Sequence, residues 1–168
     1  MMITRESDYA IRMIRALKDG EQLTIEQICR KEQIPRQFAY KILKKLEKAG
    51  LVSIRRGAGG GCSLGRSLEG LTLLDIIHAA DEEFFLTPCL KKGYHCEYAS
   101  GDLPGQEPGD CADQELVGPP GQEPVGPSDQ ESAHSPVRQC TVHCELARIQ
   151  RILEAELGRS TLDRLFGP

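Results

Sequence analysis

The 168-residue sequence contains no tryptophan and few other aromatic residues, with four tyrosines and four phenylalanines. It also lacks an apolar run long enough to span a bilayer, and its charged first residues, MMITRESDYAIR, do not resemble a signal peptide. We therefore expect a cytoplasmic protein with no membrane partner. The glycine-rich GAGGG falls within a predicted hairpin and not between a strand and a helix, so it is not a phosphate-binding loop. Because no pattern of a hydrolase or transferase is found, we predict that the protein is not an enzyme.

Charge is distributed unevenly along the chain, although the formal net charge is only −4. Residues 30–66 contain ten Lys or Arg and two acidic residues, which is a net charge of +8. Residues 97–139 contain nine acidic residues and one Arg, which is a net charge of −8. The overall balance gives no indication of nucleic-acid binding, but the basic segment does indicate an anionic partner.

The spacing of apolar residues predicts a mainly α-helical fold with a small β-hairpin. Thr24 followed by Gln27 is a capping-box pattern, Pro35 separates two helices, and Gly50 ends the second of these. Helices are expected over residues 6–18, 24–32, 36–48, 72–80 and 141–157, and the hairpin between 51 and 65. This order of elements, with a basic hairpin after the third helix, is that of a winged helix-turn-helix with a long C-terminal helix.

Residues 97–139 differ in kind from the rest of the chain. They contain seven of the ten prolines and a duplicated segment that begins PGQEP, and almost no large apolar residues. Such a segment buries too little apolar surface to offset the entropy lost on ordering, so we predict a disordered Pro/Gly-rich insertion. The chain then divides into a winged-helix DNA-binding domain at 1–84, a loop at 85–144 that contains the insertion, and a helix with a tail at 141–168.

The predicted third helix and hairpin carry candidate DNA-contacting side chains. Amide and guanidinium donors near the start of a major-groove helix suit base edges, and lysines further along suit phosphates. Arginines near the hairpin tip suit an adjacent minor groove or the DNA backbone. The candidates are Arg36, Gln37, Tyr40, Lys41, Lys44, Lys45, Arg55 and Arg56. A solvated basic face without a partner is the alternative, because exposed lysines are common.

Soft metal ligands crowd the start of the last predicted helix, where RQCTVHCEL contains Cys140, His143 and Cys144. Upstream, TPCLKKGYHCEY adds Cys89 and Cys96. The close-spaced cysteine run of ferredoxins is absent, which disfavours an electron carrier. In a reducing compartment these cysteines are ligands or reactive thiols more often than a disulfide framework. Cys and His sets of this kind suit an iron–sulfur cluster or a structural Zn²⁺.

The strings SDYAIRMIRAL, IPRQFAYKILKKLEKAGLV and RGAGGG resemble the Rrf-two (Rrf2) family of bacterial transcription regulators, which includes the IscR and NsrR types. The similarity extends over residues 1–96 and resumes near Arg138. The resemblance implies a winged-helix homodimer that binds a double-stranded DNA operator. It also implies that the last long helix, in the segment 141–168, forms the dimer interface.

The resemblance further implies an iron–sulfur cluster, with [2Fe–2S] favoured over [4Fe–4S]. The IscR-type pattern is matched by the ligand set Cys89, Cys96, Cys140 and His143, which makes residues 85–144 a cluster-binding loop. Two alternative fourth ligands remain. Asp8 matches the position from which NsrR-type members supply a carboxylate from the partner subunit, although Ser7 or Asp8 is more simply explained as a helix N-cap. Cys144 could replace His143.

The remaining cysteines are not included in the predicted ligand set. Cys111 lies in the insertion and is a spare or resolving thiol, whereas Cys29 and Cys62 are expected to be packing thiols. The resulting hypothesis is a repressor that senses redox state, nitric oxide or iron–sulfur supply through its cluster. Two alternatives stay open, a regulator stabilised by zinc and a cluster-free regulator that responds to a metabolite, a protein partner or thiol oxidation.

Overall fold

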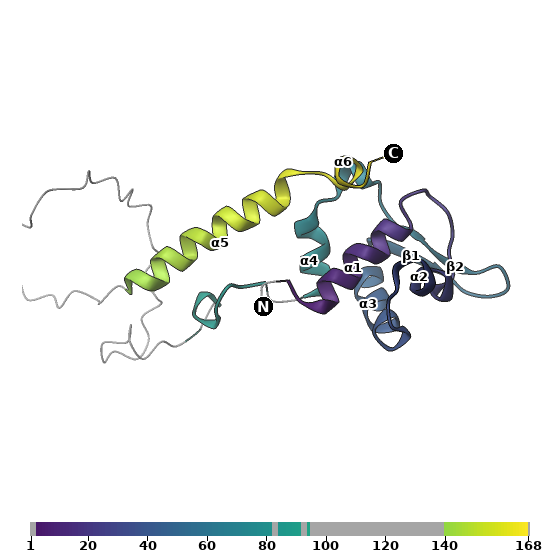
Figure 1. Cartoon of the computed structure of the whole chain (residues 1–168), viewed down its shortest axis with the longest axis horizontal. Helices are drawn as coiled ribbons and strands as arrows, with labels where there is room; N and C mark the ends of the chain where they lie inside the picture. The colour runs from purple at the N-terminus through teal and green to yellow at the C-terminus, as the bar shows by residue number, and fades with distance from the viewer. Residues whose placement is uncertain (1–2, 82–83, 92–93, 95–139, 168) are drawn as a thin grey trace, which may run out of the picture. The chain divides into compact units, whose positions relative to one another are not determined.

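The computed structural model describes residues 3–81, 84–91, 94 and 140–167 (Figure 1). The chain forms two compact units, one made of Met1–Leu86 with Gln150–Pro168 and the other of Thr87–Ile149. Within the described ranges, no helix combines the length and apolar character that crossing a membrane requires. The predicted insertion at 97–139 lies outside these ranges.

Four helices form the N-terminal part of the first unit, α1 (Arg5–Ala16), α2 (Ile25–Glu32), α3 (Arg36–Lys48) and α4 (Leu73–Ala80). Helix α1 packs against each of the other three, and α3 also packs against α2 and α4 (Figure 1). Their apolar stripes meet in one core, which stabilises the unit because each large aliphatic side chain contributes about 1.5–3 kcal/mol when buried. The largest fully buried apolar side chains are Met13, Ile14, Leu17, Ile28, Ile42, Leu46, Leu71, Ile76, Ile77 and Leu162.

Capping side chains fix where the helices begin. The predicted capping box is present at α2, where Thr24 and Gln27 exchange side-chain and backbone hydrogen bonds. The N-cap of α1 is Thr4, whose hydroxyl accepts from the Ser7 N–H at 3.2 Å, so the prediction that Ser7 or Asp8 caps this helix is wrong. The helix begins at Arg5, one residue before the predicted range of 6–18, and ends at Ala16, two residues before the end of that range.

The predicted hairpin is present as β1 (Val52–Arg55) paired antiparallel with β2 (Gly61–Leu64). An isolated bridge between Leu23 and Cys62 adds a third backbone segment to this small sheet. Gln22, next to that bridge, donates from Nε2 to the Gly59 carbonyl at 2.9 Å. The loop between α1 and α2 therefore supports the hairpin, which is the wing of the winged helix.

The tip of the wing requires glycine. Gly57 and Gly59 have φ angles of +102° and +79°, a region that L side chains rarely adopt. A Cβ atom at Gly60 would lie 2.3 Å from the Arg55 carbonyl oxygen, which leaves no room for any side chain. The tight turn presents Arg55 and Arg56 as exposed residues at the end of the first strand.

The end of the chain returns to the first unit. Helix α5 (Thr141–Arg159) is followed by a short helix α6 (Leu162–Phe166), which contacts the 3₁₀ turn η1 (Leu68–Gly70). The Leu162 side chain is fully buried and its N–H donates to the Leu71 carbonyl at 2.8 Å. The sequence analysis predicted α5, with an end two residues earlier, but not α6. A second 3₁₀ turn, η2 (Pro88–Leu90), belongs to the second unit.

Candidate functional site

Basic and polar side chains cover the solvent face of α3 and the tip of the wing. Seven of the eight predicted DNA-contacting residues are exposed, and only Lys45 is half-buried. The opposite face of α3 is apolar and buried through Ala39, Ile42, Leu43 and Leu46. The helical period therefore separates a core face from a face that is free to enter a groove.

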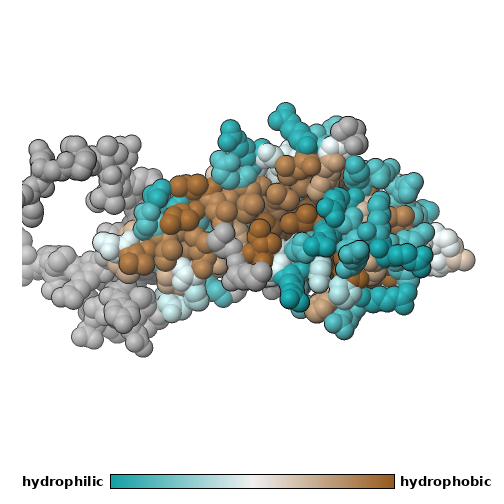
Figure 2. Space-filling model, in the orientation of Figure 1, coloured by the Kyte–Doolittle hydropathy of each residue, from teal (hydrophilic) through white to brown (hydrophobic). Residues whose placement is uncertain are grey.

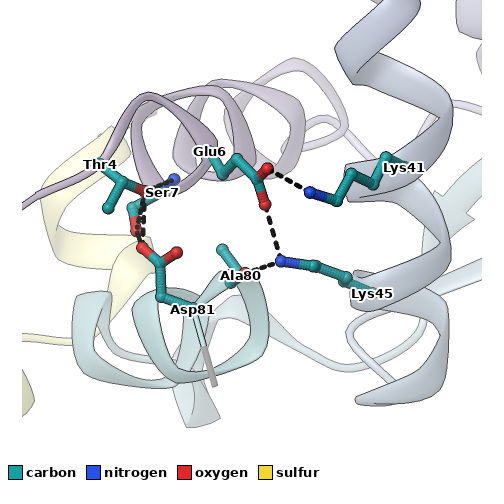
Figure 3. Close-up of polar contacts among 7 residues, drawn as sticks. All are labelled: Thr4, Glu6, Ser7, Lys41, Lys45, Ala80 and Asp81. Carbon is teal, nitrogen blue, oxygen red and sulfur yellow. Dashed lines mark hydrogen bonds and ion pairs between the residues drawn. The ribbon is translucent and has the colours of Figure 1, made fainter. Parts of the chain in front are cut away.

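Two lysines of this surface are paired with one carboxylate of α1. Lys41 Nζ lies 2.6 Å from Glu6 Oε1, and Lys45 Nζ lies 2.7 Å from Glu6 Oε2. Lys45 also donates to the carbonyl of Ala80 at the end of α4 (Figure 3). Hydrogen bonds from Lys41 and Lys45 lower the pKa of the Glu6 carboxyl, so this group is ionised at neutral pH. Both lysines were predicted from the sequence to contact DNA, whereas no sequence pattern indicated Glu6.

Hydroxyl groups at the start of α1 hold the residue that follows α4. Thr4 Oγ1 donates to Asp81 Oδ2 at 2.6 Å, and the fully buried Ser7 hydroxyl donates to the same oxygen (Figure 3). Asp81 is the C-cap of α4 and begins the segment that leads to Cys89. The direction in which that segment starts is thus set by α1.

A buried glutamine on α5 binds the same connecting segment further along. Gln150 Oε1 accepts from the Leu86 N–H at 2.8 Å, and Gln150 Nε2 donates to the Phe84 carbonyl at 2.9 Å and to Glu154 at 2.7 Å. These partners are 64 and 66 residues away for the two backbone groups, so no local pattern in the sequence indicated them. Leu86, the nearer of the two backbone partners of Gln150, lies three residues before Cys89.

The predicted metal ligands fall mainly in the second unit. Cys89 lies in η2 and is half-buried, with its sulfur 3.5 Å from Thr87 Oγ1. Cys140 directly precedes α5, and His143 follows in its first turn, both half-buried. Cys96 lies outside the described residues. In the part of the chain that is described, no three His, Cys, Asp or Glu side chains form a group able to hold a metal. The four-ligand set therefore stays a prediction.

The alternative ligands and the spare cysteines occupy different surroundings. Asp8 lies on α1 and pairs with Arg12 at 3.0 Å, and Cys144 lies in the first turn of α5. Cys111 lies outside the described residues. Cys29 and Cys62 are buried, and burial raises the pKa of both thiols, as expected for packing residues. Thiolate chemistry is consequently disfavoured at these two positions.

Comparison with known proteins identifies the family. The model of the Rrf2 family, described as an iron-dependent transcriptional regulator, matches residues 3–105. The chain belongs to the Rrf2 family. The Rrf2 family consists of transcriptional regulators and not enzymes, as the sequence analysis expected.

Individual Rrf2 relatives match mainly the N-terminal part of the chain. Protein aau3 of Rhizobium meliloti (strain 1021) is 35% identical over 95 residues, covering 55% of this chain and 62% of the relative. NsrR of Bacillus subtilis (strain 168) is 28% identical, covering 53% and 63%. IscR of Vibrio campbellii is 31% identical, covering 55% and 57%. The chain thus spans less than two thirds of the length of these curated relatives.

Solved structures of Rrf2 regulators share the fold along nearly the whole chain. CymR of B. subtilis superposes with a TM-score of 0.57 at 17% identity, covering 99% of this chain and 96% of CymR. IscR of T. potens superposes with a TM-score of 0.59 at 15% identity, covering 98% and 85%. The predicted fold class, mainly α with a hairpin wing, is confirmed.

Replacing Gln150 by Ala tests the hydrogen bonds between α5 and the backbone at Phe84 and Leu86. The change leaves the Leu86 N–H and the Phe84 carbonyl without partners, so we expect the free energy of unfolding to fall by on the order of 1–3 kcal/mol. Thermal and urea unfolding monitored by circular dichroism measure this loss. The matched control is Gln37→Ala, an exposed helical position whose side chain makes no hydrogen bond to any residue that the structure describes, where a change within about 0.5 kcal/mol is expected. Equal effects of the two variants would contradict the role of Gln150.

Proposed function

We propose that this chain is a cytoplasmic, homodimeric DNA-binding repressor that senses redox state, nitric oxide or iron–sulfur supply through an iron–sulfur cluster. The observation that carries the DNA-binding part is the exposed basic surface on α3 and the wing, supported from behind by a buried helix-turn-helix core. Membership of a family of transcriptional regulators supports the same conclusion.

The chemistry of the α3 surface suits duplex DNA. Arg36 and Gln37 occupy the first turn of α3 and are exposed, as donors for base edges need to be. Tyr40 is 54% exposed one turn later, so its ring and hydroxyl are accessible to a bound duplex. Lys44 and the wing residues Arg55 and Arg56 supply charge for phosphates.

An apolar face of α5 supports a homodimer. Val142, Ile149 and Ile152 are 64%, 39% and 51% exposed, and Gln150 is the one buried residue of α5. Figure 2 shows apolar surface running along this helix. Apolar helix faces of this kind are covered by a partner, and a second copy related by a two-fold axis is the commonest solution. Two copies would also place two α3 helices for a two-fold symmetric operator.

The donor chemistry near α5 fits an iron–sulfur cluster. Cys89 and Cys140 carry free, half-buried thiols, and His143 adds an imidazole one turn into α5. Thiolates are the standard cluster ligands, and one imidazole can replace a thiolate. Cys89, Cys96, Cys140 and His143 would hold the cluster, with [2Fe–2S] favoured. Asp8 or Cys144 is the alternative fourth ligand, and Cys144, which is disulfide-bonded in the structure, would first have to be reduced. When bound, such a group supplies a redox-active centre that oxygen and nitric oxide can attack.

The long insertion is compatible with this ligand set. Residues 97–139 separate Cys96 from Cys140 by 43 residues. Closing a loop of that length instead of one of about five residues costs roughly 2 kcal/mol more, because the entropy of loop closure grows with the logarithm of length. Metal sites with several thiolates gain on the order of 10 kcal/mol, which exceeds that cost.

The chain itself offers a route from the ligands to the DNA-binding surface. Cys89 follows Leu86 by three residues, and Gln150 holds Leu86 and Phe84 by hydrogen bonds to their backbone groups. Ser7 holds Asp81 at the start of the same segment. A change in the segment around Cys89 therefore acts on contacts with both α5 and α1, and α1 packs against α3.

The DNA-binding surface is tested by the salt dependence of binding. Replacing Lys44 or Arg55 by Ala removes one phosphate contact, so each variant should bind DNA more weakly. The plot of log K against log salt concentration should become less steep by about one unit of slope. Titration of a fluorescent duplex at several salt concentrations measures both quantities. Arg164→Ala, an exposed arginine on α6, is the control and should leave the slope unchanged. The same slope in all four proteins would refute this surface.

The dimer interface is tested by placing a charge on the apolar face of α5. Ile149→Asp should convert the protein from dimer to monomer, because a buried unpaired carboxylate strongly disfavours association. Sedimentation equilibrium measures the mass. Ala155→Asp is the control, since Ala155 is also exposed on α5 but lies about a third of a turn away from Ile149. A wild-type protein that is already monomeric would contradict the proposal outright.

The cluster is tested by purifying the protein without oxygen and measuring visible absorption, iron and sulfide. Single changes of Cys89, Cys96 or Cys140 to Ala should abolish the absorption, because each removes a ligand, whereas Cys111→Ala should not. Colourless protein that contains stoichiometric zinc would support the structural zinc alternative instead. Loss of colour on Cys111→Ala together with retention on Cys140→Ala would show that the ligand assignment is wrong.

A further inference from the structure

The lysines of α3 differ in how strongly the protein itself binds them. Lys45 has a side chain that is 27% exposed, and its ammonium contacts both Glu6 and the Ala80 carbonyl. Lys41 is 62% exposed, and among the described residues its ammonium forms an ion pair with Glu6 alone. Lys44 is exposed, and it forms no ion pair with any residue that the structure describes. The number of described contacts made by the ammonium group therefore falls from Lys45 to Lys41 to Lys44.

Glu6 is the common partner of the two held lysines. It lies in the first turn of α1 and its side chain is 24% exposed, with one oxygen directed at each ammonium (Figure 3). A carboxylate and a DNA phosphate are both oxygen anions that accept hydrogen bonds from an ammonium. The Glu6 carboxylate and a DNA phosphate would consequently compete for the Lys41 ammonium.

The position of Lys45 favours a different role. Its ammonium bridges three helices, since Lys45 is on α3, Glu6 on α1 and Ala80 at the end of α4. Moving Lys45 to a phosphate would leave the Ala80 carbonyl and one Glu6 oxygen without this donor. Lys41, by contrast, gives up one exposed contact when it leaves Glu6, and exposed ion pairs are weak.

From this geometry we propose that Glu6 is a positioning residue of the DNA-binding surface. Glu6 keeps Lys45 bound between α1 and α4, and it releases Lys41 when a DNA phosphate binds that lysine. The inference rests on the proposed DNA-binding role of α3 and refines it. Lys45 orients the helix and does not contact DNA. Because Glu6 competes for Lys41, it lowers affinity for any duplex, whatever its sequence.

The first experiment compares three lysine variants on one probe, a mixed-sequence duplex of about two helical turns. Lys44→Met and Lys41→Met should each lower the salt slope by about one, because each loses a phosphate contact. Lys45→Met should leave the slope unchanged while lowering the melting temperature. If Lys45→Met lowers the slope as much as Lys44→Met does, the inference is overturned. If neither Lys44→Met nor Lys41→Met changes it, the DNA-binding surface itself is wrong.

The second experiment removes the competing charge. Glu6→Gln should raise affinity for the same duplex about two- to five-fold at low salt, beyond the rise in the control Glu47→Gln, which removes an equal charge from α3 itself. In a Lys41→Met background the gain from Glu6→Gln should fall to that of Glu47→Gln, because the lysine that it frees is absent. A gain of equal size in both backgrounds, or no gain over Glu47→Gln, would overturn the inference. This second experiment does not use Lys45→Met, so its outcome does not depend on whether that variant folds.

Discussion

The need to satisfy buried polar groups is the constraint on which the arrangement of the helices depends. In the described part of the chain three polar residues are buried, Ser7, Glu32 and Gln150, and no buried side-chain nitrogen or oxygen lacks a partner. Each of the three joins segments that are distant in sequence. Ser7 binds Asp81 after α4, Glu32 of α2 binds Arg15 of α1, and Gln150 of α5 binds the backbone at Phe84 and Leu86. An apolar core is tolerant of small shifts, whereas these hydrogen bonds fix particular positions.

The elements that the sequence predicted well are those determined by local rules. The capping box of Thr24, the turn at Pro35 and the apolar stripe of α3 all act within a few residues, and each was found where expected. The missed features depend on partners far along the chain. Thr4 caps α1 and also contacts Asp81, 77 residues away, and α6 forms where Leu162 enters a core built by the N-terminal residues.

The candidate site divides in the same way. Helical periodicity was sufficient to place five exposed side chains on α3, because a buried stripe on one side of a helix fixes what faces water on the other. The hairpin pattern placed the two exposed arginines, Arg55 and Arg56, on the wing. Helical periodicity could not distinguish Lys44 from Lys45, since the difference lies in Glu6, 39 residues from Lys45. The ligand set came from a resemblance and from the chemistry of sulfur and imidazole, and it includes Cys96, which lies outside the described residues.

The return of the chain end to the first unit has a consequence for how the protein is made. Leu162 completes a core whose other members precede residue 87, and the intervening segment carries the cysteines proposed as ligands. During synthesis on the ribosome, the N-terminal helices emerge first but lack this apolar residue until the segment between residue 87 and Leu162 has also been made. Completion of the winged-helix core therefore depends on prior synthesis of the segment that carries the proposed ligands.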